Sequence, residues 1–397
     1  MKTICFLTDS MFSIGGVQRV TAVIAKHLAE DFDVTIVTFD KPDTQDTSLY
    51  GLDQAHLHYR FFRYPPLGKT KRKLCKTWGG IYRKLRLPYQ WASDLYARTS
   101  FPSELRNALA DELARGHYDV IVGVHAPLAA RLATLRSRLE GTRLVGWIHN
   151  SFEALFSETS LYIGPELKRH YVYQFRKLDA TVVLCRHDAE TYRAYDPRLT
   201  TTPIYNPLTL TPGERSTGTS KRFLAVGRFS PLHKGFDLLI EAFHLFAQHD
   251  SEWHLDIVGE GKEEARYRQL ISQYQMEDRI TLHPFTNHIQ QYYSQAQVYV
   301  LSSRWEGFGL VLVEAMAHGL PVVSSDLPTS LEIMGDFGLY FKNGDTHELA
   351  RQLEQATRIN WNDKSAEALS IAARFDVEAI ANQWRQLIEN VCFRATI

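Results

Sequence analysis

The sequence predicts an α/β protein built from two domains, each with a mostly parallel sheet. Its 397 residues exceed what one hydrophobic core usually serves, so two domains of under about 200 residues each are expected. Apolar runs typical of buried strands alternate with amphipathic helical patterns along the chain, which indicates repeated strand–helix units. The alternation restarts after a polar stretch that contains proline and glycine, at residues 206–220.

The elements before this linker form one array. An amphipathic helix is predicted over residues 17–30. Buried strands are predicted over residues 3–8, 33–39, 118–126, 143–149 and 180–185. No pattern is recognised between residues 41 and 115.

The second array repeats the first in outline. Strands are predicted over residues 222–229, 254–259, 279–285 and 296–303. Helices are predicted over residues 235–249, 263–275, 310–318 and 377–393. No internal sequence repeat is evident, so we expect two domains of similar architecture and not a solenoid.

Composition excludes several classes of protein. With 44% hydrophobic and 23% charged residues and a net charge of zero, the chain is neither disordered nor a general nucleic-acid binder. The four cysteines, Cys5, Cys75, Cys185 and Cys392, form no C-x-x-C pair, which argues against a disulfide framework or a zinc site. No segment approaches the roughly 20 apolar residues of a membrane span. We therefore expect a cytoplasmic protein that is neither secreted nor integral to a membrane.

Two glutamates stand in the apolar segment SRWEGFGLVLVEAMAHGLPVV, which begins at Ser303. A buried carboxylate is costly unless it is paired or hydrogen-bonded, so Glu306 and Glu314 need partners. The segment follows a strand and turns into a helix, at the edge where open parallel sheets bind ligands and where helix amides attract anions. Sugar hydroxyls would supply the partner. The alternative is that Glu306 caps the helix and Glu314 forms a surface ion pair.

This segment resembles the E-x7-E motif of retaining GT-B glycosyltransferases of family GT4. The stretches GGVQRV, WIHN, AVGRFSPLHKGFDLLIEAF and DIVGEGKEEARY follow in the family's order, so the resemblance spans roughly residues 1 to 340. It implies the GT-B fold, in which two Rossmann-like domains face each other across a cleft. Residues 1–205 would then hold the acceptor and residues 206–378 the nucleotide-sugar donor. A last helix over residues 379–397 would pack back on the N-terminal domain.

The resemblance implies a role for each matching residue of the second half. Glu306 would contact hydroxyls of the donor sugar and Glu314 the ribose. Fixed cations stabilise the charge that develops on a leaving diphosphate, which is the role implied for Arg228 and Lys234. The backbone amides implied to meet the sugar and the phosphate are those of Phe308, Gly309 and Leu310.

Two further positions in the first half match the family. Gly15 and Gly16 form the turn before the first helix, where close approach of donor phosphates is favoured. This turn lacks the G-x-G-x-x-G spacing of dinucleotide-binding dehydrogenases. His149 ends a strand and would lie beside the anomeric carbon, where it positions the sugar instead of acting as the general base. An ordinary structural histidine and an ordinary turn glycine are the alternatives.

No metal or cofactor is expected beyond the substrate nucleotide sugar. The Asp31–Asp33 pattern DFD resembles a metal-binding D-x-D, but it follows a helix and precedes a strand, opposite the ligand-binding edge of the sheet. Arg228 and Lys234 would replace the divalent ion. The predicted activity is therefore retaining, metal-independent transfer of a hexose or N-acetylhexosamine from a UDP-linked donor to a glycan. A nucleotide-sugar epimerase of the same fold and a non-catalytic sugar-binding protein are the alternatives.

A basic segment outside the family motifs points to the acceptor. Between Arg60 and Arg98 eleven Lys and Arg residues accompany a single acid, Asp94, and are interleaved with aromatic side chains. Cations attract anionic lipid, and aromatic rings favour the interface. We therefore predict a lipid-linked acceptor in bacterial polysaccharide or glycolipid synthesis, a peripheral location on the inner face of the cell membrane, and no nucleic-acid partner. The predicted patch consists of Lys71, Arg72, Lys73, Trp78, Arg83 and Lys84. A merely solvated basic loop is the alternative.

Overall fold

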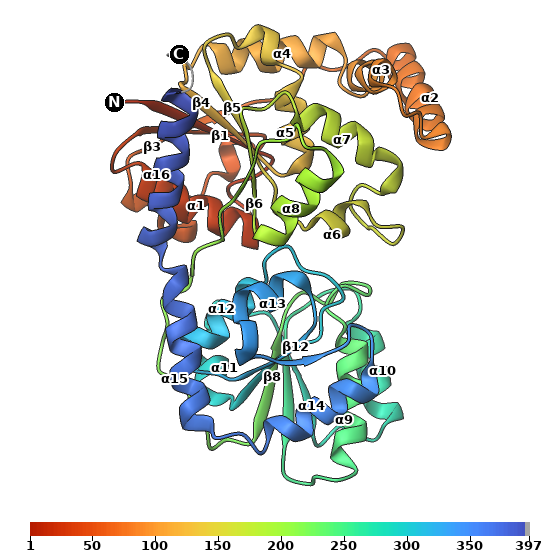
Figure 1. Cartoon of the computed structure of the whole chain (residues 1–397), viewed down its shortest axis with the longest axis vertical. Helices are drawn as coiled ribbons and strands as arrows, with labels where there is room; N and C mark the ends of the chain where they lie inside the picture. The colour runs from red at the N-terminus through yellow and green to blue at the C-terminus, as the bar shows by residue number, and fades with distance from the viewer. Residues whose placement is uncertain (394–397) are drawn as a thin grey trace. The chain divides into compact units, whose positions relative to one another are not determined.

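The computed structural model describes residues 1–393 and divides the chain into two compact units (Figure 1). Unit 1 contains the residues up to Pro207 together with those from Val377 onward, and unit 2 is Leu208–Asp376. Each unit has one parallel sheet covered by helices, which is the predicted α/β architecture.

The sheet of unit 1 has seven parallel strands in the order β3-β2-β1-β4-β5-β6-β7. Strands β1 to β3 follow one another towards one edge of the sheet, and strands β4 to β7 follow one another towards the other edge. The strand order therefore reverses between β1 and β4. Ligands of open α/β sheets bind at the carboxyl ends of the strands beside such a reversal. The strands are β1 (Thr3–Thr8), β2 (Asp33–Thr38), β3 (Leu57–Phe61), β4 (Val120–Val124), β5 (Arg143–Trp147), β6 (Ala180–Val183) and β7 (Thr201–Pro203).

The helices of unit 1 cover this sheet, apart from two that lie at the periphery of the unit (Figure 1). Those from the first part of the chain are α1 (Gly16–Leu28), α2 (Lys69–Leu85), α3 (Gln90–Ser100), α4 (Ser103–Ala114), α5 (Ala126–Ala133), α6 (Phe152–Phe156), α7 (Lys168–Phe175) and α8 (Arg186–Tyr195). Short 3₁₀ helices are η1 (Pro42–Thr44), η2 (Leu49–Gln54), η3 (Arg136–Arg138) and η4 (Pro165–Leu167).

The last helix, α16 (Val377–Phe393), returns to unit 1, and residues 394–397 of the predicted last helix lie outside the described residues. The Trp384 ring lies 4.6 Å from Trp147 and 6.5 Å from Phe6, measured between ring centroids. Arg385 forms an ion pair with Asp31, with Nε 2.6 Å from Oδ2. The aspartate that begins the DFD pattern therefore has a protein partner, as does Asp33, whose Oδ1 lies 3.3 Å from His58 Nε2.

The sheet of unit 2 has six parallel strands in the order β10-β9-β8-β11-β12-β13, with its reversal between β8 and β11. The strands are β8 (Arg222–Val226), β9 (His254–Val258), β10 (Ile280–His283), β11 (Val298–Leu301), β12 (Val322–Ser325) and β13 (Leu339–Phe341). The helices are α9 (Phe236–Ala247), α10 (Glu264–Gln273), α11 (Gln290–Gln295), α12 (Leu310–Ala317), α13 (Pro328–Met334), α14 (Thr346–Ala356), α15 (Trp361–Ala372), η5 (Gly335–Phe337) and η6 (Ala373–Phe375).

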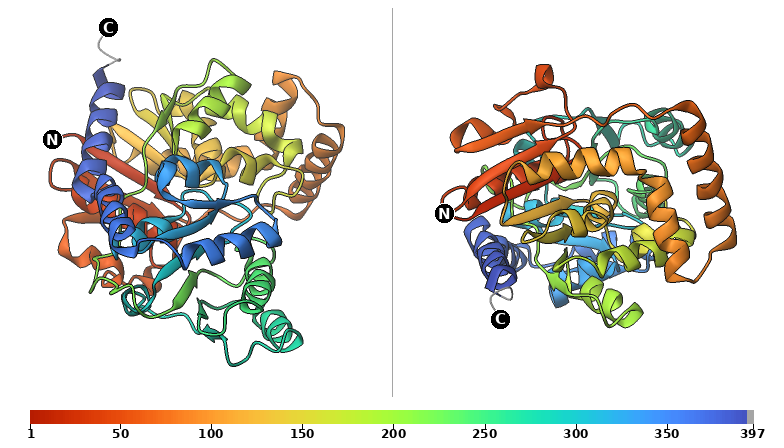
Figure 2. Two further views of the ribbon diagram at one scale, coloured as in Figure 1. Left: turned by 60° about the horizontal axis from the view of Figure 1, so that its bottom comes forward. Right: turned by 90° about the horizontal axis from the view of Figure 1, so that it is seen from above.

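Residues 69–100, within the stretch in which the sequence shows no recognised pattern, form a helical hairpin at the periphery of unit 1. Helices α2 and α3 lie side by side, beyond α4 and α7 (Figures 1 and 2). They share a small hydrophobic cluster of their own, made of Tyr82, Ala92, Tyr96 and Leu167. Among the described residues, no helix is long and apolar enough to cross a bilayer.

Candidate functional site

The acidic segment joins β11 to α12 at the strand-order reversal of unit 2. The helix begins at Leu310, as predicted, and its N-cap is Gly309 with φ 83°, a conformation that strains any other residue. No side chain caps this helix, and Glu314 is only 3% exposed. The alternative reading, with Glu306 as a cap and Glu314 in a surface ion pair, is therefore wrong.

Glu306 has a protein partner in this structure, although the sequence reading looked to sugar hydroxyls for one. Its side chain is 8% exposed, and Lys234 Nζ lies 2.6 Å from its Oε1. The Ser303 hydroxyl donates to the same oxygen at 2.6 Å. Burial alone would raise the pKa of Glu306, but the charge of Lys234 and these hydrogen bonds outweigh burial and hold the pKa below its usual value. Glu306 is therefore a carboxylate at neutral pH.

The β8–α9 loop that carries Lys234 is fastened to the acidic segment. The Ser302 hydroxyl donates to the Lys234 carbonyl at 2.8 Å, and the Arg304 N–H donates to the His233 carbonyl at 2.8 Å. A Cβ on Gly235 would come 2.0 Å from the Ser302 carbonyl oxygen, so only glycine permits this approach.

A second ion pair reinforces the same junction. The Arg304 guanidinium binds both carboxylate oxygens of Asp237 at 2.9 Å each. Bidentate pairs of this kind fix orientation as well as adding energy. These contacts between the two loops therefore hold the side chains of Lys234 and Glu306 next to each other.

Arg228 and His233 belong to the same electrostatic cluster. Arg228 follows β8 and its side chain is exposed. The pKa of His233 is lowered by burial in the first place, with Lys234 and Arg228 acting in the same direction and Glu306 against them. The ring of His233 stacks on Trp305 at 5.2 Å. Lys234 and Glu306 thus meet at the carboxyl ends of β8 and β11, and Arg228 lies on the same β8–α9 loop as Lys234.

Glu314 occupies a second buried position on α12. The Tyr293 hydroxyl donates to Glu314 Oε2 at 3.0 Å. Tyr299, on β11, is fully buried, and burial together with the charges of Glu306 and Glu314 raises the pKa of its phenol well above the usual value.

His149 lies in unit 1, two residues after β5. The imidazole is 7% exposed and contacts Trp147 and His125, with ring centroids 4.4 and 5.4 Å away. Its Nε2 has no hydrogen-bond partner among residues 1–393. Burial, and next the neighbouring His125, hold the pKa of His149 well below its usual range. The imidazole is therefore neutral at physiological pH and is a weak base.

Sequence reasoning missed His125, which it treated as the end of a strand. The residue follows β4 with φ 75°, and its N–H donates to the Trp147 carbonyl at 2.9 Å. Burial lowers the pKa of His125, and the charge of Asp9, just after β1, opposes that shift. Asp9, His125 and His149 thus follow three adjacent strands at the reversal in unit 1. The available signal was a histidine immediately after a buried parallel strand.

Gly16 is the first residue of α1 and is exposed. The preceding amide, that of Gly15, donates to the Tyr50 hydroxyl at 2.9 Å. An anion at this turn would therefore meet the amides that follow Gly15.

Some cations of the basic segment form ion pairs in the structure and others do not. Lys71 forms an ion pair with Glu104 at 2.5 Å, and the segment's single acid, Asp94, pairs with Lys177 at 2.8 Å. Trp78 is half-buried and packs against the hairpin's cluster. The exposed members of the predicted patch are Arg72, Lys73, Arg83 and Lys84.

The described residues contain no group of three or more His, Cys, Asp or Glu side chains that could hold a metal ion. Asp31 and Asp33 of the DFD pattern pair with Arg385 and His58.

Two sequence families match the chain, one over each unit. The family described as Glycosyltransferase Family 4 matches residues 14–211, and that described as Glycosyl transferases group 1 matches residues 211–376. The chain belongs to glycosyltransferase family 4. The predicted enzyme class is therefore confirmed.

Relatives and solved structures resemble this glycosyltransferase over different extents. An uncharacterized glycosyltransferase of Haemophilus influenzae is 24% identical over 98% of this chain and 100% of its own length. The amylovoran biosynthesis glycosyltransferase AmsD of Erwinia amylovora is 31% identical over 42% of this chain and 48% of its own. The crystal structure of Anabaena HepE with UDP-glucose matches with a TM-score of 0.73 and 21% identity, covering 98% of this chain and 100% of that one. The glycosyltransferase thus has the predicted GT-B fold.

Proposed function

We propose that this glycosyltransferase moves a hexose or N-acetylhexosamine from a UDP sugar to a lipid-linked glycan, with retention of configuration and without a metal ion. The setting would be bacterial surface polysaccharide or glycolipid synthesis. Support comes from the Erwinia relative named for amylovoran biosynthesis and from the similar Anabaena protein crystallised with UDP-glucose.

The observation that carries the proposal is the Lys234–Glu306 pair, on a loop that also carries Arg228. In the free chain, Lys234 neutralises the buried carboxylate. A donor diphosphate would offer Lys234 a second anion, while hydroxyls of the donor sugar would offer Glu306 hydrogen bonds. Because the leaving diphosphate gains negative charge as the sugar departs, Lys234 and Arg228 stabilise the transition state more than the ground state. Two cations thereby take the part that a divalent ion plays elsewhere.

Glu314 fits the ribose of the nucleotide. A carboxylate accepts hydrogen bonds only, and two neighbouring ribose hydroxyls can each donate one. The Tyr293 hydroxyl fixes the carboxylate from one side. Nucleotide binding, rather than chemistry, therefore depends on this residue.

His149 fits a positioning role. A neutral imidazole with a free ring nitrogen can exchange a hydrogen bond with a donor hydroxyl, but its low pKa makes it a poor general base at pH 7. In the proposed retaining reaction, the diphosphate departs from one face of the sugar and the acceptor attacks the same face. An oxygen of the departing phosphate accepts the acceptor's proton there.

The α2–α3 hairpin supports a membrane-bound acceptor. Leu74, Leu85 and Trp91 are large apolar side chains of the hairpin that are 67%, 58% and 60% exposed. The exposed cations Lys73 and Lys84 lie on the same helix. An apolar surface accompanied by cations matches an anionic bilayer, where each Lys or Arg contributes about 1 kcal/mol. The hairpin would hold the enzyme on the membrane reversibly.

A thermal-shift screen against UDP, GDP, ADP and their sugars tests the donor assignment. A ligand at 100 times its dissociation constant stabilises the native state by about 2.7 kcal/mol. We expect UDP and one or more UDP sugars to raise the melting temperature. Stabilisation by none of these nucleotides would contradict the proposal. Incubating the stabilising sugar without any acceptor separates a transferase from an epimerase, because only an epimerase would change it into an isomer.

A further inference from the structure

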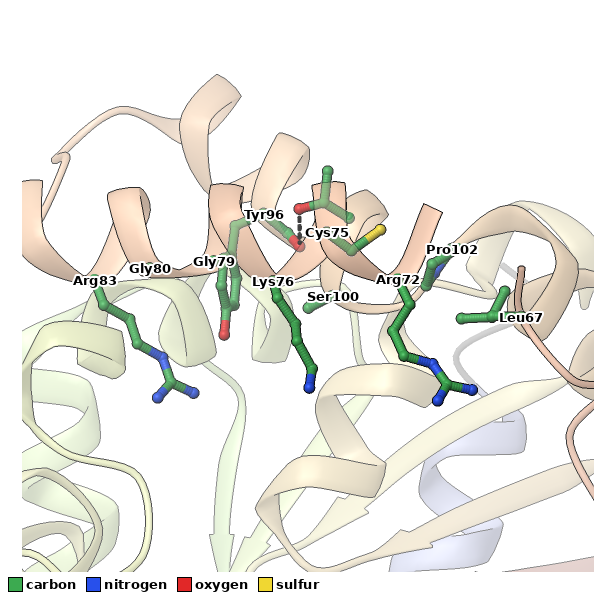
Figure 3. Close-up of a pocket in the computed structure, with 11 residues that line it drawn as sticks. Leu67, Arg72, Cys75, Lys76, Gly79, Gly80, Arg83, Tyr96, Ser100 and Pro102 are labelled. Atoms are coloured by element: carbon green, nitrogen blue, oxygen red, sulfur yellow. Dashed lines mark hydrogen bonds between the residues drawn. The ribbon is translucent and has the colours of Figure 1, made fainter. Parts of the chain in front are cut away.

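A groove of about 460 Å³ runs along one face of α2, within unit 1 (Figure 3). Arg72, Lys76 and Arg83 line it, at spacings of four and seven residues that keep them on one helical face. Figure 3 shows their three side chains extending from α2 to the same side. The exposed apolar residues Leu74 and Leu85 are spaced to lie on a different face of the helix. The groove is therefore distinct from the surface that we propose for the membrane.

The charge of the groove is uncompensated. None of its lining residues is acidic, and within residues 1–393 none of the three cations forms an ion pair with a carboxylate. The nearby acids Glu104 and Asp94 pair with cations outside the groove, Lys71 and Lys177. Like charges four residues apart on a helix repel, so Arg72 and Lys76 destabilise the free helix. A bound anion would remove this repulsion.

Two glycines in the middle of α2 keep the groove open. Glycine destabilises a helix interior relative to alanine, so it needs a reason there. Packing gives none: a Cβ on Gly79 would meet only a Tyr96 ring carbon, at 3.7 Å, and a Cβ on Gly80 would meet nothing within 4 Å. Both line the groove between Lys76 and Arg83. Their absent side chains leave room for a ligand.

The remaining lining selects the kind of anion. Leu67, Pro102 and the Tyr96 ring add an apolar wall, so the ligand should carry an apolar portion as well as charge. Arg72 and Arg83 are eleven residues apart, which is roughly 16 Å along the helix axis. A single phosphate is too small to contact cations at both ends of that length, whereas the two phosphates of a diphosphate can each contact a different cation while the attached chain lies on the apolar wall.

We propose that this groove binds the diphosphate of a lipid-linked acceptor, with the cations on the phosphates and the start of the lipid chain on the apolar wall. The inference rests on the proposed lipid-linked acceptor and adds its phosphate site. Bulk anionic phospholipid carries the same chemistry, a phosphate on an apolar chain, and the experiment separates the two sources.

Calorimetric titration of the full chain with geranyl diphosphate, without membranes, tests the groove directly. Replacing Arg72, Lys76 and Arg83 by Ser should weaken binding by about tenfold or more, since charge-assisted hydrogen bonds to phosphate are lost. The matched control replaces Lys73, Lys84 and Arg98, three exposed cations of the hairpin that do not line the groove, and should change the affinity by less than about threefold, since it alters net charge equally but no direct contact. Equal weakening in both triple variants would overturn the site.

A second pair of variants changes space and leaves charge alone. Gly79→Leu should fill the groove and weaken geranyl diphosphate binding, while Thr77→Leu adds an apolar side chain to an exposed position of α2 outside the groove and should not. Circular dichroism checks that α2 stays folded. Unchanged binding by Gly79→Leu would contradict the proposal, as would inorganic pyrophosphate binding as tightly as geranyl diphosphate.

Two further titrations identify the source and isolate the donor site. Binding to phosphatidylglycerol vesicles that requires the groove cations, together with no binding of geranyl diphosphate, would show that the groove binds bulk lipid. That result would overturn the lipid-linked acceptor as its ligand. UDP is titrated into the same samples, because its proposed site lies in unit 2. If geranyl diphosphate does not bind the groove but UDP still binds, the groove proposal is rejected and the donor assignment remains. If the wild-type protein binds geranyl diphosphate in the groove but does not bind UDP, the donor assignment alone is rejected.

Discussion

The ammonium of Lys234 lies 2.6 Å from the carboxylate of Glu306, and both side chains are nearly buried. Removing one member of such a pair leaves an uncompensated charge, which typically costs about 3–5 kcal/mol, whereas replacing both by apolar residues is often neutral. The pair therefore offers a way to separate stability from catalysis.

We expect Lys234→Ala to lose most transfer activity and several kcal/mol of stability. The double variant Lys234→Met with Glu306→Leu should recover stability in urea unfolding while remaining inactive. An active double variant would contradict the roles given to both residues. Loss of activity in Lys234→Ala that the double variant repairs would mark the pair as structural.

The two glutamates should affect different kinetic constants. Glu306→Gln should lower kcat by about a hundredfold with donor affinity little changed, since the interaction counts most in the transition state. Glu314→Gln should weaken UDP binding by about tenfold, which corresponds to 1.4 kcal/mol. Tyr293→Phe, which removes only the hydroxyl that steadies Glu314, should shift affinity in the same direction and less. Near-normal kinetics in both glutamine variants would refute the assignment.

Stability should fall in mild acid because His149 is buried and neutral. Its folded pKa lies below the unfolded value of about 6.5, so the unfolded state takes up the proton first as pH falls. The stabilising contribution is full above pH 6.5 and is lost progressively below it, by about 1.4 kcal/mol per pH unit. His149→Gln should flatten the pH dependence of unfolding in unit 1, whereas exposed His56→Gln should not. If the free energy of unfolding changes with pH in the same way in the wild type and in His149→Gln, the role given to His149 is contradicted.

The membrane assignment predicts a dependence on both lipid charge and apolar contact. Co-sedimentation should require anionic vesicles, weaken with salt, and weaken in Lys73→Ser with Lys84→Ser. Leu74→Ser with Leu85→Ser should reduce it further. We exclude Lys71 from the test because Glu104 already pairs with it. Equal recovery on neutral and anionic vesicles would reject the assignment.

The sequence predicted some of the elements that have local periodicity, and left others, such as α14, unassigned. Helix α12 was expected over 310–318 and is Leu310–Ala317, and α16 was expected over 377–393 and is Val377–Phe393. The edge strands β7 and β13, each three residues long, carry too short a pattern to detect. Helix α2 was hidden because its surface is charged and its buried contacts are few.

The candidate site was predicted in its residues but not in its pairing. Lys234 and Glu306 are 72 residues apart, and no local pattern tells which cation will reach a given carboxylate. The same holds for His125 beside His149, since their neighbourhood depends on β4 and β5 pairing in register, with Val124 opposite Trp147. Residue types were readable from the sequence, whereas contacts between strands required the sheet.

Proton NMR of the glycoside formed in the presence of EDTA tests the central claim most directly. From an α-linked UDP sugar and a lipid-linked acceptor, we expect an α-glycoside to form at an undiminished rate when metals are chelated, because Lys234 and Arg228 supply the charge on which the leaving diphosphate depends. A β-glycoside, or transfer abolished by EDTA and restored by manganese, would contradict the account.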